Sequence, residues 1–493
     1  MELYRFFRFA IEKMCKKKKS LNHLNNTVSA DLSWNDLALN TIGSLPNNQS
    51  AWMPEYAVSN SLKVIKRFAN NKLVTFTSYN EWNSLPEKLT VIQDKQNYGQ
   101  EIKQSAFYTN ECASLGFVLN KILLSFETGI SGYFRRLNTD VFGVEISDLV
   151  ASEALTTDYL HVFASPKFEW AYKKLELTLN LPVNLYSYFF SGTIHNRTEF
   201  FLSPSLAAWF RIAPGMSLTL RGSARRSPAS LHNIHDSSIL TDYRSFTSGI
   251  DDYYTSSGQS LSVSYSYRSA PVGLFIMAMG NYGWNKSKYG TVQNLIGDYV
   301  FYSYQSQPTD SRTAMAFFNI SKTIDFMRGT IGVKGYYRRL ENSLLLQGLH
   351  TDYCNDSFSL SPFIYGNIST CFNWGLRLVW DKSFLKISNM PRRSSDSFIY
   401  IGNVTVTPCS LITWTTGGEF YHNQIAEGLN KEIFMLDTKL TFNVSRRIEI
   451  SVSATNLFNK KEYGYTSYST VSQYERSSKL RGREFMISIY LKK

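Results

Sequence analysis

The sequence predicts an all-β protein, and within that class a transmembrane antiparallel up-and-down β-barrel. Three observations lead to this fold class. Apolar and polar residues alternate with a period of two, short turns alternate with long polar stretches, and no apolar run reaches the roughly 20 residues that a spanning helix needs. Aromatic residues make up 15% of the 493-residue chain and charged residues only 18%, a composition that suits surfaces shared between water and hydrocarbon.

The period of two is clearest in three parts of the chain. Leucine and valine fill alternate positions of residues 175–185, and the pattern returns in residues 436–444 and 448–455 on either side of a turn. Because successive strand side chains point to opposite faces, each segment predicts a strand with one apolar side. The chain ends on such a strand, with an apolar face formed by Phe485, Ile487, Ile489 and Leu491.

The first 19 residues predict a further strand. Glu2, Arg5, Arg8, Glu12 and Lys13 interrupt the apolar core that a secretion signal would need. The apolar residues also fit a helical stripe, but we favour a strand because a hairpin follows.

Short turns and long polar stretches alternate along the chain. Polar stretches rich in Ser, Asn, Asp and Tyr predict long loops, among them residues 79–103, 226–258 and 285–310. Short turns are predicted near residues 16–19, 69–71, 120–121, 172–174, 213–215, 269–271, 322–326, 370–372, 407–410 and 445–447. Short periplasmic turns with long extracellular loops are typical of outer-membrane barrels. Ten hairpins and the terminal strand make about 21 strands, and the even number of bacterial barrels indicates 22, with the first strand missing before Met1.

Charge and cysteine content narrow the function classes. The formal charge is +13, but the basic residues are scattered and only residues 16–19 form a run. This distribution favours a solvated or headgroup-facing surface over nucleic-acid binding. The five cysteines show neither a CxxC motif nor metal-ligand spacing. We interpret them as small apolar side chains, with a Cys371–Cys409 disulfide as an alternative.

Two motifs occupy the end of the chain. SVSATNLFNKKEYGY spans residues 451–465, and LRGREFMISIYLKK spans residues 480–493. Together they resemble the final two barrel strands of TonB-dependent outer-membrane receptors, most closely those of the Bacteroidetes type. Asn456-Leu457-Phe458-Asn459-Lys460 resembles the NLFNK turn of that family, and residues 85–89 and 242–245 are weaker echoes.

The resemblance implies the C-terminal barrel portion of a receptor, one domain over residues 1–493 that lacks the signal peptide, the plug and the first strand. It implies that the terminal strand pairs with the first strand. It also implies that Phe485, Ile487, Ile489 and Leu491 face lipid, and that the outer-membrane assembly machinery recognises this strand. The TonB system is an expected partner only if a plug and a TonB box exist upstream. Many members end on an aromatic residue, whereas this chain ends on two lysines.

Few residues suggest chemistry. His232 and His235 are weak metal candidates, because a spacing of three suits a ligand pair on a helix but is incidental in a Ser-rich loop. The chain shows no nucleophile elbow and no phosphate-binding glycine loop, so we expect no enzyme and no cofactor. Loop aromatics could stack on a sugar or an aromatic chelator, although an interfacial girdle or loop packing explains them equally well: Trp52, Trp82, Tyr98, Trp284, Tyr302 and Tyr304.

The leading hypothesis is therefore the barrel of a TonB-dependent receptor in the outer membrane of a Gram-negative cell, which takes up a siderophore, a glycan or a cofactor. One alternative is a plug-free passive pore or structural barrel. A second alternative is a soluble β-rich binding protein. Such a protein would dissolve in buffer without detergent, whereas a membrane barrel would need detergent.

Overall fold

The computed structural model describes residues 3–16, 22–41, 46–68, 72–94, 96–144, 152–191, 195–228, 233–235, 237–250, 252–388, 390–426, 429–445, 447–468 and 473–491. These residues are almost entirely β-strand, with one 3₁₀ turn, η2 (Asp325–Met327), between two strands. No helix in these ranges has the length and hydropathy to cross a bilayer. The predicted all-β fold class is confirmed.

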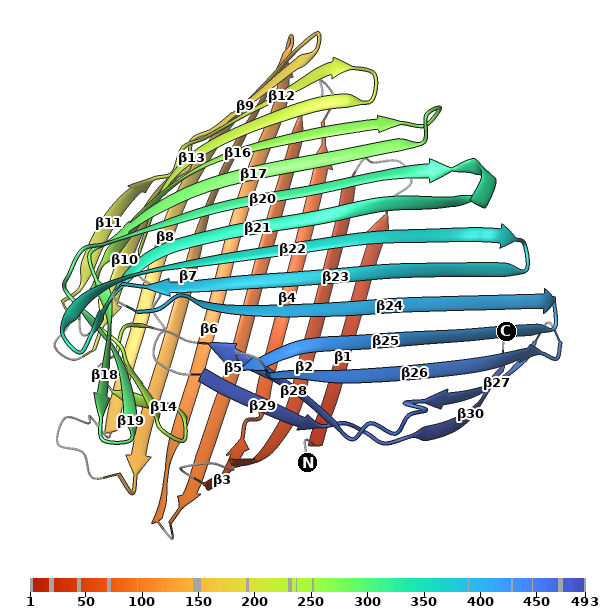
Figure 1. The fold of residues 1–493 in the computed structure, drawn as a ribbon. Coiled ribbons are helices and arrows are strands. Elements are labelled where there is room, and N and C mark those ends of the chain that lie inside the picture. The colour runs from red at the N-terminus through yellow and green to blue at the C-terminus, as the bar shows by residue number, and fades with distance from the viewer. Residues whose placement is uncertain are drawn as a thin grey trace.

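The strands form an antiparallel wall in which each strand pairs with its neighbours along the chain (Figure 1). The unbroken strands are β1 (Leu3–Lys16), β2 (Asn22–Thr41), β5 (Leu73–Gln93), β6 (Gln96–Leu119), β7 (Ile122–Phe142), β8 (Ser152–Tyr172), β13 (Met216–Pro228), β16 (Thr255–Ser269), β17 (Leu274–Ser287), β20 (Thr309–Ile324), β21 (Gly329–Leu346), β22 (Leu349–Ser369), β23 (Phe372–Ile387), β24 (Arg393–Cys409), β25 (Ile412–Ala426), β26 (Leu429–Asn443), β27 (Ile448–Thr455) and β30 (Glu484–Leu491).

Three further paths through the wall are each broken once, by a proline. They are β3 (Asn47–Trp52) with β4 (Glu55–Arg67), β9 (Leu175–Asn180) with β10 (Val183–Phe190), and β11 (Arg197–Leu202) with β12 (Ser205–Ala213). With these paths counted once each, the described wall has about 21 strands, as predicted.

Pro182 and Pro204, at two of these breaks, lie at the same height in the wall as a third proline, Pro166, which is inside β8. Pro166 of β8, Pro182 and Pro204 stand in adjacent paths, since the ladder pairs Asn180 with both Lys167 and Ser205. Proline has no N–H to donate to a ladder. The carbonyls of the three prolines accept hydrogen bonds instead, from the N–H groups of Leu181 (3.1 Å), Ser203 (3.0 Å) and Ala224 (3.0 Å).

The register of the ladders gives the wall two unlike faces. On one face Val58, Trp82, Phe107 and Phe134 stand directly opposite one another on β4 to β7, and all four are exposed. The same face continues through Ile320, Val333 and Leu378 to Phe485, Ile487 and Ile489, which are 65–72% exposed. We call this the outer face. The opposite, inner face is richer in Tyr, Ser, Asn and charged residues.

Several predicted turns are confirmed. Strands end and begin around residues 120–121, 172–174, 213–215 and 370–372, and the first segment forms strand β1. Asn120 and Lys173 take positive φ angles of 57° and 52° in their turns. Gly215 (φ 74°) must be glycine, because a Cβ there would lie 2.1 Å from the carbonyl oxygen of Arg268. The predicted turn at residues 69–71 lies outside the described residues.

The prediction of long loops at the end of the wall opposite the short turns is wrong in detail. We call this end the mouth end. The stretch 79–103 is not a loop, because β5 and β6 continue through it as a ladder to the pair Gln93–Gln96. β6 has 24 residues, about 80 Å at the usual rise per residue, so the wall extends well past one bilayer thickness. Three other polar stretches form hairpins: β14 (Ser238–Asp242) with β15 (Ser245–Ser248), β18 (Gly290–Ile296) with β19 (Tyr299–Gln305), and β28 (Glu462–Tyr468) with β29 (Gln473–Lys479).

The two border strands of the wall run in the same direction. β1 leads into the turn before β2 at the short-turn end, and β30 runs from the β28–β29 hairpin toward that end. Among the described residues, β1 pairs with β2 and β30 with β27, and no ladder joins β1 to β30. The pairing that the resemblance implies joins the terminal strand to a first strand placed before Met1, so the described residues do not test it. An antiparallel closure would also be impossible between two strands of the same direction.

Candidate functional site at the mouth

Two hairpins cross the mouth end of the wall as one ribbon. β15 pairs with β19 in parallel, with Ser245 opposite Val300, and β18 pairs in parallel with the end of β21, with Val292 opposite Leu345. The spatial order is therefore β14, β15, β19, β18 and then β21, and we call the first four strands the mouth ribbon. Its strands lie near the mouth ends of β6 to β8 (Figure 1).

The far edge of the mouth ribbon is hydrogen-bonded to the inner face of the opposite wall. The N–H of Leu240 donates to Oε1 of Gln100 on β6 at 2.6 Å, and the hydroxyl of Tyr98 donates to the carbonyl of Tyr243 at 2.5 Å. The N–H of Ser237 donates to Glu153 of β8 at 2.8 Å. Gln100 and Tyr98 are almost completely buried, so the ribbon ties β21 to β6 and β8 across the mouth.

An apolar core holds the ribbon in place. Phe246 is fully buried and lies against the ring of Phe301, with centroids 5.1 Å apart and planes 10° apart. Its cluster joins the ribbon residue Leu240 to the wall residues Val91 and Tyr98. The ribbon residues Leu240 and Phe246 are about 150 residues from Val91 and Tyr98 along the chain, so no local sequence pattern could have shown these contacts.

Replacing Phe246 with alanine should release the ribbon while leaving the wall intact. Loss of a fully buried Phe costs about 3–5 kcal/mol, more than a small hairpin can sustain. We expect faster hydrogen exchange and protease cleavage in residues 237–250, with no change in exchange of β20 to β26. Phe326→Ala is the matched control, because that ring is 89% exposed in a turn at the other end. Equal protection in both variants would contradict this packing.

Below the ribbon, tyrosines form rows on the inner face. Tyr108, Tyr133, Tyr159 and Tyr188 stand directly opposite one another on β6, β7, β8 and β10. Neighbouring rings lie near each other, with centroids 5.8 Å apart for Tyr133–Tyr159 and 6.0 Å apart for Tyr159–Tyr188. We call these four residues with Tyr186 the tyrosine wall. Sequence reasoning missed it, although the alternate placing of Tyr186 and Tyr188 was a visible signal.

The tyrosine wall continues into polar groups. The ring of His161 stacks on Tyr186 with centroids 3.9 Å apart, and its nitrogens contact Ser131 Oγ (2.9 Å) and Asn184 Oδ1 (3.0 Å). Glu81 stands opposite Tyr108 at one end of the row, and Arg197 opposite Tyr188 at the other. Tyr108, Tyr133, Tyr159 and Tyr186 are half-buried, so their faces are partly open. Such a surface can stack on planar or sugar rings and exchange hydrogen bonds with hydroxyl groups.

The segments on either side of the β14–β15 hairpin close over the end of the tyrosine wall nearest the mouth. Tyr253, between β15 and β16, packs on Tyr188 with centroids 4.8 Å apart, and Ile234 completes the cluster. Burial raises the pKa of the Tyr253 phenol, and the nearby Glu199 carboxylate raises it further. Burial also raises the pKa of Tyr304 on β19. Both phenols therefore stay neutral at physiological pH.

The aromatic residues proposed as ligand contacts in loops all lie in strands, so the loop assignment is wrong. Trp52, Trp82 and Trp284 share the outer face, because their ladder partners are Lys88, Phe107 and Arg312. They lie among exposed apolar and charged residues, where a girdle of aromatic residues is expected. Tyr98 is buried under the ribbon, and Tyr302 and Tyr304 belong to β19 within it.

The metal candidates are not brought into a metal site by the described residues. His232 lies outside the described part of the chain. His235 is buried, and its Nδ1 lies 2.9 Å from the carbonyl oxygen of Ser237. No group of three or more His, Cys, Asp or Glu side chains in the described ranges could hold a metal ion. Cys371 and Cys409 are free, so the alternative disulfide is not formed.

A second feature of the inner face is a recess lined by glycines. A hollow of about 380 Å³ lies over β22 to β26, with Gly375, Gly417 and Gly418 beneath it. Arg377, Glu419 and Asp437 supply charge at its margin. Gly417 leaves open space where a side chain would stand on the inner face, so another backbone can approach the wall closely there.

A rolled antiparallel wall with an apolar outer face, a polar inner face and a covered mouth has the architecture of membrane-spanning β-barrels. No family profile and no curated protein matches the sequence. Among solved structures, FyuA from Yersinia pestis, a ferric yersiniabactin uptake receptor, is 10% identical, with a TM-score of 0.48 over 99% of this chain and 78% of that chain. The siderophore receptor PiuA from Acinetobacter baumannii is 9% identical, with a TM-score of 0.46 over 100% of this chain and 81% of that chain. The FpvAI–pyocin S2 complex is 10% identical, with a TM-score of 0.46, and the chain spans 66% of its length.

Proposed function

We propose that this chain is the barrel of an outer-membrane receptor that binds a ring-bearing nutrient on the tyrosine wall. The observation that carries the proposal is the division of one continuous wall into two faces. The outer face presents Trp82, Phe107 and Phe134 to its surroundings, and the inner face presents half-buried tyrosines beneath a ribbon of β-strands. An exposed apolar band of this extent suits hydrocarbon and not water.

The glycine recess favours a receptor over a passive pore. A pore needs an inner wall lined by solvated side chains, whereas a backbone-deep recess beside Arg377 and Asp437 fits a second element packed inside the barrel. We propose that this element is a plug and that uptake through it depends on the TonB system. Binding measurements on the unaltered chain and on tyrosine-wall variants would identify the ligand class as siderophore, glycan or cofactor.

The two borders support a wall of 22 strands. β1 and β30 run in the same direction, so one strand of the opposite direction between them would pair antiparallel with both. We propose that the barrel closes through such a strand, which would also satisfy the backbone groups of both borders in lipid.

Reconstitution tests the membrane part of this proposal. The chain refolded in detergent and moved into vesicles should show heat-modifiable gel migration. Its tryptophan fluorescence should be quenched by lipids brominated on the acyl chains, because Trp82 lies on the outer face. Stable folding in buffer without detergent, with no quenching by these lipids, would support the soluble binding protein instead.

Ligand binding tests the receptor part. The probes are a ferric catecholate chelate, a set of oligosaccharides and a corrinoid, titrated against the reconstituted chain by calorimetry. We expect saturable binding of one class, weakened about 2- to 12-fold by Tyr133→Ala, at the usual worth of one aromatic contact. Trp82→Ala, on the outer face, is the matched control and should bind normally. Ohmic conductance with no saturable ligand would favour the passive pore.

A further inference from the structure

A patch of polar side chains interrupts the apolar outer face on β2, β4, β5 and β6. Asn80 and Ser78 of β5 are two and four residues from Trp82, so they lie on the same face as that ring. In the ladder, Asn80 stands opposite Asn60 of β4, and Ser78 stands opposite Glu111 of β6. We call this patch the polar island, and its six half-buried members are Asn26, Asn60, Ser78, Asn80, Thr109 and Glu111.

The polar island lies between the two aromatic rows of the wall. Glu111 is four residues from Phe107 and eight from Leu119, about 13 Å and 26 Å along β6. Phe107 stands in the row of Trp82, and Leu119 stands in the row of Trp170 near the short turns. Exposed apolar side chains surround the island on this face: Val28, Phe76, Leu115, Phe126 and Ile130. In a bilayer the island therefore faces acyl chains, where polar and ionisable side chains are costly unless they find partners.

Hydrogen bonds inside the island leave polar atoms over. Ser78 Oγ donates to Oε1 of Glu111 at 2.7 Å, and Asn80 Nδ2 lies 3.5 Å from the same oxygen. Within the described residues, no donor contacts Oε2 of Glu111 and no cation pairs with this carboxyl group. Asn60 donates one N–H of its amide to Asn26 Oδ1 at 3.2 Å, which leaves the second N–H for another acceptor.

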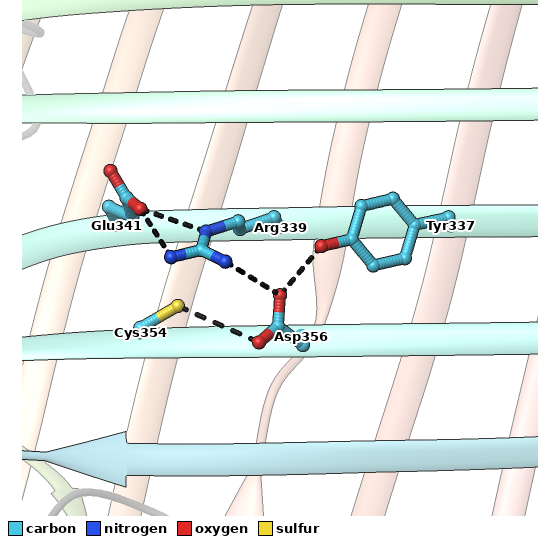
Figure 2. Close-up of polar contacts among 5 residues, drawn as sticks. All are labelled: Tyr337, Arg339, Glu341, Cys354 and Asp356. Atoms are coloured by element: carbon cyan, nitrogen blue, oxygen red, sulfur yellow. Dashed lines mark hydrogen bonds and ion pairs between the residues drawn. The ribbon is translucent and has the colours of Figure 1, made fainter.

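Carboxylates elsewhere on the outer face are matched within the chain. Figure 2 shows two of them at the mouth end of β21 and β22. Glu341 accepts from Nε and Nη2 of Arg339, both at 2.8 Å. Asp356 lies 4.0 Å from Nη1 of the same arginine and accepts from the hydroxyl of Tyr337 at 2.9 Å. Glu111 has no such cation, so its partner comes from outside the described chain.

We propose that the polar island is the contact between two copies of this chain in the membrane. In a twofold pair the same patch meets itself, and amides and hydroxyls suit this because they both donate and accept. Glu111 on β6 and Asn60 on β4 flank β5, so a twofold axis over β5 brings each of them to the other in the second copy. Oε2 of Glu111 then accepts from the Asn60 amide of the second copy, and the reverse bond forms by symmetry.

The chemistry of the island favours a second copy over a different protein with a basic membrane segment. A lysine would match Glu111 but has no acceptor for the second N–H of Asn60. A copy of the island supplies both the acceptor and the donor, and the apolar side chains around it pack against their counterparts. The contact rests on the proposed function, because only a wall in lipid gains from hiding these polar groups from acyl chains.

The test uses the full chain in vesicles, with batches that carry donor and acceptor dyes mixed before reconstitution. Förster transfer is measured as the lipid-to-protein ratio is raised, and we expect a dimer that dissociates on dilution in lipid. Glu111→Leu should weaken dimerisation about tenfold or more, because the pair loses two symmetric hydrogen bonds. The heat-modifiable band should persist, since leucine is less costly in lipid than glutamate. Glu111→Gln keeps a carbonyl acceptor and should stay within about threefold of the unaltered chain.

The matched control makes the same substitution elsewhere on the outer face. Glu432 of β26 is exposed, stands opposite His422 and lies 3.1 Å from its Nδ1. Glu432→Leu should leave dimerisation unchanged within about threefold. Equal losses in Glu111→Leu and Glu432→Leu would overturn the island in favour of general surface charge. An unaltered dimer in Glu111→Leu would place the contact elsewhere, and an equal loss in Glu111→Gln would overturn the hydrogen bond as its basis.

The two proposals fail in different ways. A chain that shows heat-modifiable migration and lipid quenching, but no Förster transfer at any lipid-to-protein ratio, disproves the paired copies alone. A chain that folds in buffer without detergent disproves the membrane barrel and the pairing together.

Discussion

Replacing Asn456 with alanine is expected to lower the free energy of unfolding by about 4–5 kcal/mol. Its side-chain Nδ2 donates to the carbonyls of Lys460 (2.7 Å) and Arg481 (2.8 Å), and its Oδ1 accepts from the N–H of Lys460 (2.9 Å). The residue is buried and has a φ of 50°, which costs alanine about 1–2 kcal/mol more than asparagine or glycine. Each buried hydrogen bond adds about 1 kcal/mol.

Two further variants separate these causes. Asn456→Gly keeps the positive φ and loses only the side-chain hydrogen bonds, so it should recover about 1 kcal/mol of the loss. Asn459→Ala removes the contact from the N–H of Arg483 (3.1 Å) and should have a smaller effect than Asn456→Ala. Urea unfolding of the reconstituted chain measures all three. If Asn456→Ala unfolds like the unaltered chain, Asn456 does not join the end of β27 to the start of β30.

The second large effect concerns two neighbouring residues of β23. Leu378→Arg should destabilise the reconstituted chain by about 2–4 kcal/mol, because Leu378 lines an apolar groove of the outer face and arginine is costly near the middle of a bilayer. Val379→Arg should cost at most about 1 kcal/mol, because Val379 is on the inner face between Arg377 and Asp381.

Each variant is the control for the other, because Leu378 and Val379 are both aliphatic, both half-buried and adjacent on the same strand, at the same distance from its ends. Urea unfolding in vesicles gives the two free energies, and the heat-modifiable band gives the folded fraction. Equal destabilisation, or a larger loss at Val379, would assign the lipid to the wrong face of the wall.

The sequence predicted the wall well, because its pattern is local. Alternation identified the strand that begins at Leu175 and the one that ends at Leu491, and short polar groups marked turns such as residues 120–121. The motif around Asn456, noted only as a resemblance, proves to be a hydrogen-bonded turn between the last two strands of the wall.

The mouth was predicted poorly, because its structure depends on distant partners. Residues 79–103 contain Ser, Asn and Pro that suggested a loop, yet Leu89 and Val91 face inward and are buried by the ribbon, which extends the ladder. The sequence leaves Trp82 and Trp284 open between ligand contact and an interfacial girdle, because composition cannot tell the two faces apart. Only the register across neighbouring strands assigns them to the outer face.

The row of Pro166, Pro182 and Pro204 gives the wall a crease. Three consecutive paths lack ladder donors at one height, and single hydrogen bonds to the proline carbonyls bridge the gap. The part above it, β10 and β11, carries Tyr188 against Tyr253. β10 remains paired with the unbroken strand β8 over eight residues, so the panel that carries Tyr188 stays joined to the wall across the crease.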